Sequence, residues 1–227
     1  MRPRAVIYDH DGTLIDSLDL VVAATNGVLV DRGVPVLPRD EVIAGMVHPT
    51  GRRMGLIVGE EDPGAQLRLA TAFYDRAFAL GTDHARVYPG VADLVVDLAA
   101  AGLPQGVVTN NQGRLARRIL AHLGLSHAIA VVVGEEDMPA PKPDPRGLVA
   151  CARRLGVEPA EAIYVGDTIG DLDTARAAGM PCIGVTWGIT PRVVLERAGF
   201  LTVVDEPGEI LEVVRRPASD VRRPNLR

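Results

Sequence analysis

Short apolar runs separated by longer amphipathic segments form the main pattern along the chain. The runs lie at residues 5–8, 105–109, 128–133, 162–166, 181–186 and 200–204. Short runs of this kind are typical of strands buried on both faces of a parallel sheet. From Gln105 onward, the segments between runs carry apolar positions at helical spacing. The pattern predicts an α/β fold whose mainly parallel sheet has helices on both faces and binds ligands at the carboxyl ends of its strands.

The stretch at residues 17–86 breaks this alternation. Its periodicity predicts helices at 17–33, 38–46, 51–58 and 65–81. We interpret 17–86 as a helical cap domain inserted into a core formed by 1–16 and 87–214. The polar, basic segment 215–227 has no periodicity, and we expect it to be a mobile tail.

Composition narrows the classes of function. The 227 residues are 47% hydrophobic and 23% charged, which suits one α/β core with a small inserted domain. The net charge of −5 argues against a nucleic-acid partner, and no apolar run approaches the length of a membrane span. We therefore expect a soluble, cytoplasmic protein without a membrane partner. Cys151 and Cys182 match no metal or redox spacing and are predicted to be buried thiols.

Two groups of carboxylates follow predicted strands. Asp9 and Asp11 come directly after the first strand, and Gly12 permits a sharp turn that brings backbone amides near a bound anion. Asp167 ends a later strand, and Asp171 lies near the start of the next helix. Carboxylates from two strand ends form the oxygen-rich site that Mg²⁺ prefers. The alternatives are a turn stabilised by aspartates for the first group and helix capping for the second.

Two further sites would serve a phosphate. Thr109 and Asn110 end a strand just before a helix, where a hydroxyl and free amides can bind an anion, although such an isolated feature is more often a helix cap. Lys142 is the only lysine in the chain and lies in the proline-rich segment 139–145. A compact ammonium suits a site crowded with phosphoryl and carboxylate oxygens, whereas the alternative is a solvated loop lysine.

The segments DHDGTL, VVTN, PKPDP and GDTIGD occur in this order, each after a predicted strand. Together they resemble the haloacid dehalogenase superfamily, whose Rossmann-like core this resemblance implies. The insertion at 17–86 is similar to the α-helical C1 cap of the phosphoglycolate phosphatase and β-phosphoglucomutase branch. His10 departs from the pattern, because the family usually has an apolar residue there.

The resemblance implies a role for each motif residue. Asp9 would be the nucleophile that attacks phosphorus, and Asp11 would protonate the leaving oxygen and then activate water. Thr109 would bind the phosphoryl group and Lys142 would neutralise its charge. The implied magnesium site consists of Asp9, the backbone carbonyl of Asp11, Asp167 and, in support, Asp171.

These features favour a Mg²⁺-dependent phosphatase acting on a small phosphorylated metabolite, as a monomer or homodimer. A β-phosphoglucomutase-like enzyme is the alternative. A non-catalytic binding protein on the same fold is less favoured, because such a protein is expected to have lost some of the core side chains, and all four are present: Asp9, Asp11, Lys142 and Asp167. By resemblance, the acid at Asp11 argues against a dehalogenase. The absence of a lysine from 17–86 argues against a phosphonatase.

The cap is expected to determine substrate specificity, because the core motifs handle only the phosphoryl group. The segment GMVHPTGRRMG offers His48, Thr50, Arg52 and Arg53. Adjacent helical residues diverge by about 100°, so at most one of the two arginines should face the substrate. The alternative is that both are solvated charges at a helix start.

Overall fold

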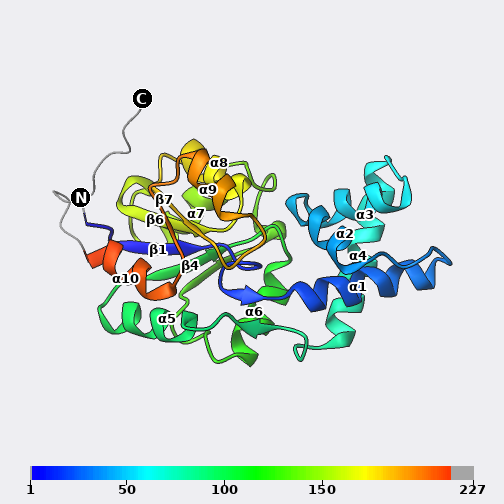
Figure 1. Ribbon diagram of the computed structural model, residues 1–227, viewed down its shortest axis with the longest axis horizontal. Coiled ribbons are helices and arrows are strands. Elements are labelled where there is room, and N and C mark those ends of the chain that lie inside the picture. The colour runs from blue at the N-terminus through cyan, green and yellow to red at the C-terminus, as the bar shows by residue number, and fades with distance from the viewer. Residues whose placement is uncertain (1, 216–227) are drawn as a thin grey trace.

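A computed structural model describes residues 2–215. Its main element is a six-stranded parallel sheet in the order β5-β4-β1-β6-β7-β8 (Figure 1). The strands are β1 (Ala5–Tyr8), β4 (Gln105–Val108), β5 (Val131–Val133), β6 (Ala162–Gly166), β7 (Cys182–Val185) and β8 (Thr202–Val204). All six coincide with the predicted runs, so the predicted α/β fold is confirmed.

Helices cover both faces of this sheet (Figure 1). One face packs against α5 (Val91–Ala100), α6 (Gly113–His122) and α10 (Pro207–Arg215). The other face packs against α7 (Arg146–Arg154), α8 (Ile169–Ala177) and α9 (Arg192–Ala198). Alternation along β1 explains the two cores, because Val6 and Tyr8 enter the first while Ala5 and Ile7 enter the second.

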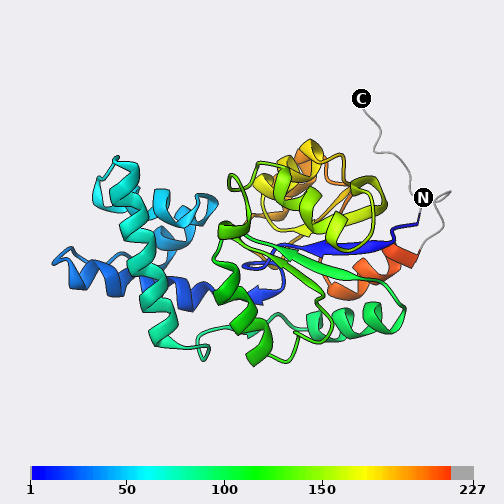
Figure 2. The ribbon, with the colours of Figure 1, turned by 180° about the vertical axis from the view of Figure 1, so that it is seen from behind.

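The inserted helices lie beyond the carboxyl ends of the strands (Figures 1 and 2). They are α1 (Leu18–Asp31), α2 (Arg39–Ala44), α3 (Thr50–Val58) and α4 (Pro63–Leu80), with a 3₁₀ turn at Gly45–Val47. This confirms the predicted helical cap. The first core continues into it, since Leu20, Met54 and Phe73 belong to the same buried cluster as Val6.

Two short antiparallel strands connect the cap to the core. β2 (Ile15–Asp16) pairs with β3 (Arg86–Val87). The segment that leads from the core into the cap therefore lies beside the segment that returns to the core. The predicted domain boundaries, 16/17 and 86/87, fall at this ladder. The exact division of the chain into domains stays a prediction.

The C-terminal helix α10 ends at Arg215, the first residue of the predicted tail. The rest of that segment, 216–227, lies outside the described residues. Within the described range 2–215, no helix is both long and apolar enough to cross a membrane. Cys151 and Cys182 are buried free thiols, as predicted.

Candidate active site

The three central strands bring the predicted core residues to one edge of the sheet. Asp9 follows β1, Thr109 follows β4 and Asp167 follows β6, and these strands are neighbours in the sheet. The Asp9 amide donates to the Val165 carbonyl at 2.8 Å, which extends the ladder to the predicted nucleophile. The parallel topology therefore places these side chains together although up to 158 positions separate them in the sequence.

Gly12 permits close approach of two chain segments. Its φ is +87°, and a Cβ at this position would lie 2.5 Å from an Asp167 carboxylate oxygen. A larger residue would therefore be strained and would displace Asp167. The Gly12 amide donates to the Ile15 carbonyl at 2.9 Å, so it is not free for the phosphate contact that the sequence suggested.

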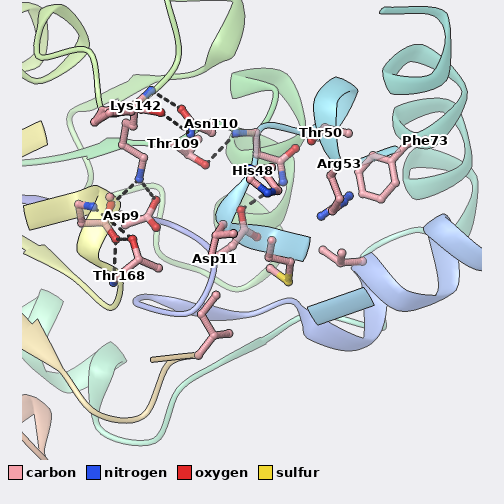
Figure 3. Close-up of a pocket in the computed structure, with 18 residues that line it drawn as sticks. Asp9, Asp11, His48, Thr50, Arg53, Phe73, Thr109, Asn110, Lys142 and Thr168 are labelled. Atoms are coloured by element: carbon pink, nitrogen blue, oxygen red, sulfur yellow. Dashed lines mark hydrogen bonds and ion pairs between the residues drawn. The ribbon is translucent and has the colours of Figure 1, made fainter. Parts of the chain in front are cut away.

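Lys142 lies at the centre of the carboxylates. Its Nζ lies 2.8 Å from Asp9 Oδ1 and 2.7 Å from Asp171 Oδ1, and its side chain is 7% exposed (Figure 3). Burial alone would lower the pKa of Lys142, but the charges and hydrogen bonds of Asp171 and Asp9 outweigh burial and raise it. The alternative of a solvated loop lysine is therefore wrong, and the side chain is a fixed cation.

Asp9, Asp167 and Asp171 form a buried group that could hold a metal ion. Each offers a carboxylate oxygen, and these oxygens all lie within 4.8 Å of one another. The donor set consists only of oxygen atoms, which fits Mg²⁺ rather than zinc. Asp171 is also held structurally, since Lys142 and Tyr164 donate to Oδ1 and Thr168 donates to Oδ2.

The electrostatics of this group also fit a cation. Burial, together with the charges of Asp171 and Asp167, raises the pKa of Asp9 well above its usual value despite the opposing Lys142. Burial and the Asp171 charge raise the pKa of Asp167 to about 7. A divalent cation would favour the ionised form of both carboxylates, because it supplies the positive charge that one lysine does not.

Asp11 has a different environment from Asp9. Ser17 Oγ donates to its Oδ1, Asn111 Nδ2 donates to its Oδ2 at 3.2 Å, and His10 Nδ1 lies 3.1 Å from Oδ1. Burial would raise the pKa of Asp11, but the nearby His10 and the donated hydrogen bonds lower it below its usual value. The free protein thus holds Asp11 as a carboxylate, the form that can accept a proton from water.

Thr109 and Asn110 occupy different roles in the structure. The Thr109 side chain is buried, lines the pocket and accepts the Asn111 amide at 3.0 Å. Asn110 holds the backbone of the lysine loop: its Oδ1 accepts the Lys142 amide at 2.7 Å and its Nδ2 donates to the Lys142 carbonyl at 3.3 Å. Asn110 therefore positions Lys142, and its contact with phosphate stays a prediction.

The cap closes the other side of the pocket. Arg53 is buried and lines it, whereas Arg52 is exposed and points elsewhere. Both lie in α3, which begins at Thr50 and coincides with the predicted helix at 51–58. Figure 3 shows Arg53 beside the Phe73 ring, on the cap side of the pocket, with Asp11 and Lys142 on the core side. Burial lowers the pKa of Arg53 to about 10, although nearby Tyr74 and Asp11 oppose this.

Several supporting residues escaped sequence reasoning. Ser17 and Asn111 contact Asp11, and Thr13 Oγ1 donates to Asp167 Oδ1 at 2.9 Å. Thr13 belongs to the motif DHDGTL and Asn111 directly follows the motif VVTN, but the carboxylates that they contact follow other strands. Only the tertiary fold shows these contacts.

Comparison with known proteins agrees with this geometry. A protein 33% identical over 219 residues is the N-acetylmuramic acid 6-phosphate phosphatase of Pseudomonas putida, with 94% of this chain and 97% of that protein aligned. The phosphoglycolate phosphatase of Xanthomonas campestris is 35% identical over 186 residues, with 82% and 84% aligned.

Solved structures share the fold. A haloacid dehalogenase-like hydrolase from Bacteroides fragilis superposes with a TM-score of 0.86 at 22% identity, covering 92% of this chain and 99% of that one. The sequence profile described as haloacid dehalogenase-like hydrolase matches residues 6–185, which contain all four motifs. The chain thus belongs to the haloacid dehalogenase-like hydrolase family.

Proposed function

We propose that this protein is a Mg²⁺-dependent phosphatase that hydrolyses a small phosphate monoester through an aspartyl phosphate on Asp9. The observation that carries the proposal is the convergence of Asp9, Lys142 and Asp167 at the carboxyl edge of the sheet, under a cap that encloses the pocket. A nucleophile, a fixed cation and a metal-binding carboxylate are the parts that phosphoryl transfer requires.

The first half of the reaction uses two carboxylates. An Asp9 oxygen attacks phosphorus and the ester P–O bond breaks, while protonated Asp11 gives its proton to the leaving oxygen. Lys142 stabilises the negative charge on the phosphoryl oxygens, since its ammonium already lies 2.8 Å from Asp9. In the free protein Asp11 is a carboxylate. The negative charge of a bound phosphate repels this carboxylate and raises the pKa of Asp11, which favours the protonated form that this step needs.

The second half regenerates the enzyme. Asp11, now a carboxylate, takes a proton from water, and the resulting hydroxide attacks phosphorus and releases inorganic phosphate and Asp9. The contacts from Ser17 and Asn111 favour this ionised form. Asp9 and Asp167, supported by Asp171, would hold Mg²⁺, which supplies Lewis-acid stabilisation of phosphoryl oxygens when bound.

The names of the two relatives suggest candidate substrates. Phosphoglycolate is our leading candidate, and N-acetylmuramic acid 6-phosphate is the second. Both molecules are phosphate monoesters that also carry a carboxylate. We propose a phosphorylated acid of this kind as the substrate class.

Phosphate release from a panel of metabolites tests the function. The panel contains both phosphorylated acids, sugar phosphates, nucleotides and p-nitrophenyl phosphate, each with Mg²⁺ or with excess chelator. We expect release from at least one phosphorylated acid with Mg²⁺ and none with chelator. Formation of glucose 6-phosphate from glucose 1-phosphate, without free phosphate, would instead indicate a mutase.

Magnesium should stabilise the protein most at high pH. The folded pKa values of Asp9 and Asp167 exceed the ordinary value of 3.8, so the metal-free fold loses stability as pH rises from about 4 through about 7. Mg²⁺ at about 100 times its dissociation constant should contribute about 2.7 kcal/mol, which corresponds to a Tm increase of roughly 5–10 °C at pH 8. At pH 5 we expect a much smaller increase, and scanning calorimetry at both values measures the difference.

The variant Asp167→Asn should raise the metal-free Tm at pH 8 and lose the Mg²⁺-dependent increase. Its amide can still accept the Ile189 N–H, and the Thr13 hydroxyl can turn to accept the new N–H₂ group. Asp173→Asn is the matched control, because this carboxylate lies on α8 but is exposed and pairs with Arg176. An undiminished Mg²⁺ effect in Asp167→Asn would refute the assignment of the metal site.

A further inference from the structure

Arg53 is a buried cation, and two of its three guanidinium nitrogens lack hydrogen-bond partners in the described part of the chain. Its side chain is 4% exposed, and solvent does not reach Nε or Nη2. Within the described part of the chain, neither nitrogen has a hydrogen-bond partner. A buried charged donor without a partner is unfavourable, so such an arrangement calls for a ligand that supplies the missing acceptors.

The two free nitrogens define the shape of that ligand. Nε and Nη2 share one edge of the planar guanidinium, and their N–H bonds are parallel. This edge matches the two oxygens of a carboxylate, which accept both hydrogen bonds at once.

The cap holds this edge in a fixed place. The Arg53 guanidinium carbon lies 4.8 Å from the centre of the Phe73 ring, a cation–π contact that holds the group against α4. Gly45 makes room for the arginine stem, because a Cβ there would lie 3.1 Å from Arg53 Cγ. Tyr74 ties the cap to the core, with its hydroxyl 3.0 Å from Thr50 Oγ1 and 2.9 Å from Glu135 Oε2.

The charge of the pocket favours a monoanion on the cap side. Arg53 is the single arginine or lysine that the cap contributes to the described lining. The other cap residues that line it are Val21, Met46, Val47, His48, Thr50 and Phe73. One guanidinium can neutralise a carboxylate, whereas a second phosphate dianion would retain uncompensated charge in a largely apolar surrounding.

We infer that Arg53 is the residue that selects the substrate, by binding a carboxylate through Nε and Nη2 while the phosphate lies against Lys142 and Asp9. This inference rests on the proposed phosphatase function and adds the substrate group that the cap recognises. It predicts that the enzyme discriminates between phosphate monoesters that differ only in a carboxylate.

Matched substrate pairs test the inference on the unmodified enzyme. Phosphoglycolate is compared with its neutral amide, and N-acetylmuramic acid 6-phosphate with N-acetylglucosamine 6-phosphate, which lacks the lactyl acid. In at least one pair, kcat/KM should be about 10- to 100-fold higher for the acid. If the enzyme hydrolysed p-nitrophenyl phosphate but showed equal kcat/KM values for the two members of each pair, the inference would be overturned and the phosphatase function would remain.

Variants then assign the preference to one side chain. Arg53→Met keeps an apolar stem of similar length and should abolish the preference, so that the ratio of kcat/KM values within each substrate pair approaches one. Arg53→Lys should restore only part of it, because an ammonium offers no planar fork. Arg52→Met is the matched control and should behave as wild type. A preference that survives in a folded Arg53→Met protein would overturn the assignment.

Binding separates this inference from catalysis. Calorimetric titration of the Asp9→Asn protein with phosphoglycolate and with its amide measures recognition without turnover. We expect the acid to bind at least about tenfold more tightly. Equal affinities, or a stronger preference for a bisphosphate such as glucose 1,6-bisphosphate, would refute the carboxylate site even if the protein proved inactive.

Discussion

Replacing Asp9 by asparagine should reduce kcat at least ~10⁴-fold on every substrate, because an amide keeps the shape of the carboxylate but cannot attack phosphorus. The amide oxygen can still accept the hydrogen bonds that Asp9 Oδ1 receives from the His10 amide and Lys142. The fold should therefore survive, with a Tm within a few degrees of wild type. Phosphate release and scanning calorimetry measure the two properties.

Asp9→Ala and Asp173→Asn are the controls for this experiment. The alanine variant cannot revert by deamidation, so equal inactivity of both Asp9 variants excludes a trace of regenerated enzyme. Asp173→Asn makes the same chemical change at an exposed carboxylate and should retain full activity. If a folded Asp9→Asn protein kept more than a small fraction of the rate, Asp9 would not be the nucleophile.

Asp11→Asn should produce the second-largest effect, and its size should depend on the leaving group. A general acid contributes about 10²–10⁴-fold when the leaving oxygen needs a proton. We therefore expect a loss of this size in kcat/KM for phosphoglycolate, whose leaving group is an alkoxide. For p-nitrophenyl phosphate, whose leaving group departs as an anion, kcat/KM should fall less than about tenfold.

The same variant should expose the second half of the reaction. Without Asp11 as a base, hydrolysis of the aspartyl phosphate slows, so stopped-flow mixing with p-nitrophenyl phosphate should show a burst of about one p-nitrophenolate per enzyme. The structure tolerates the change, because the new amide oxygen can keep the hydrogen bond from Asn111 Nδ2 while the Ser17 hydroxyl turns to accept from the new N–H₂ group. Equal losses on both substrates, without a burst, would remove Asp11 from proton transfer.

The proposal for Arg53 connects these effects to specificity. Asp9 and Asp11 act on the phosphoryl group that every phosphate monoester carries, so their loss should affect all substrates. Arg53 lies on α3 in the cap and is argued to contact only the remainder of the substrate. Its loss should therefore change the ranking of substrates rather than the chemistry.

The sequence by itself determined the architecture and the core of the site. Short continuous apolar runs specified the six parallel strands, because residues on such strands are buried on both faces of the sheet. The motif order then placed Asp9, Thr109 and Asp167 at strand ends, and parallel strands end at the same edge of the sheet. The helical cap followed equally from periodicity, since amphipathic helices carry a local signal.

Only the tertiary structure decided which side chains meet. The direction of α3 buries Arg53 and exposes Arg52, although the two are neighbours of the same type. The Gly12 N–H donates to the Ile15 carbonyl, and Asn110 Oδ1 accepts the Lys142 N–H. In both cases the geometry of the turn determines where the group points. Ser17 and Asn111 meet at Asp11 from positions 94 residues apart, and no local pattern encodes a contact between distant segments. Periodicity reports how each segment is buried, whereas the partner of a polar side chain depends on how the segments pack.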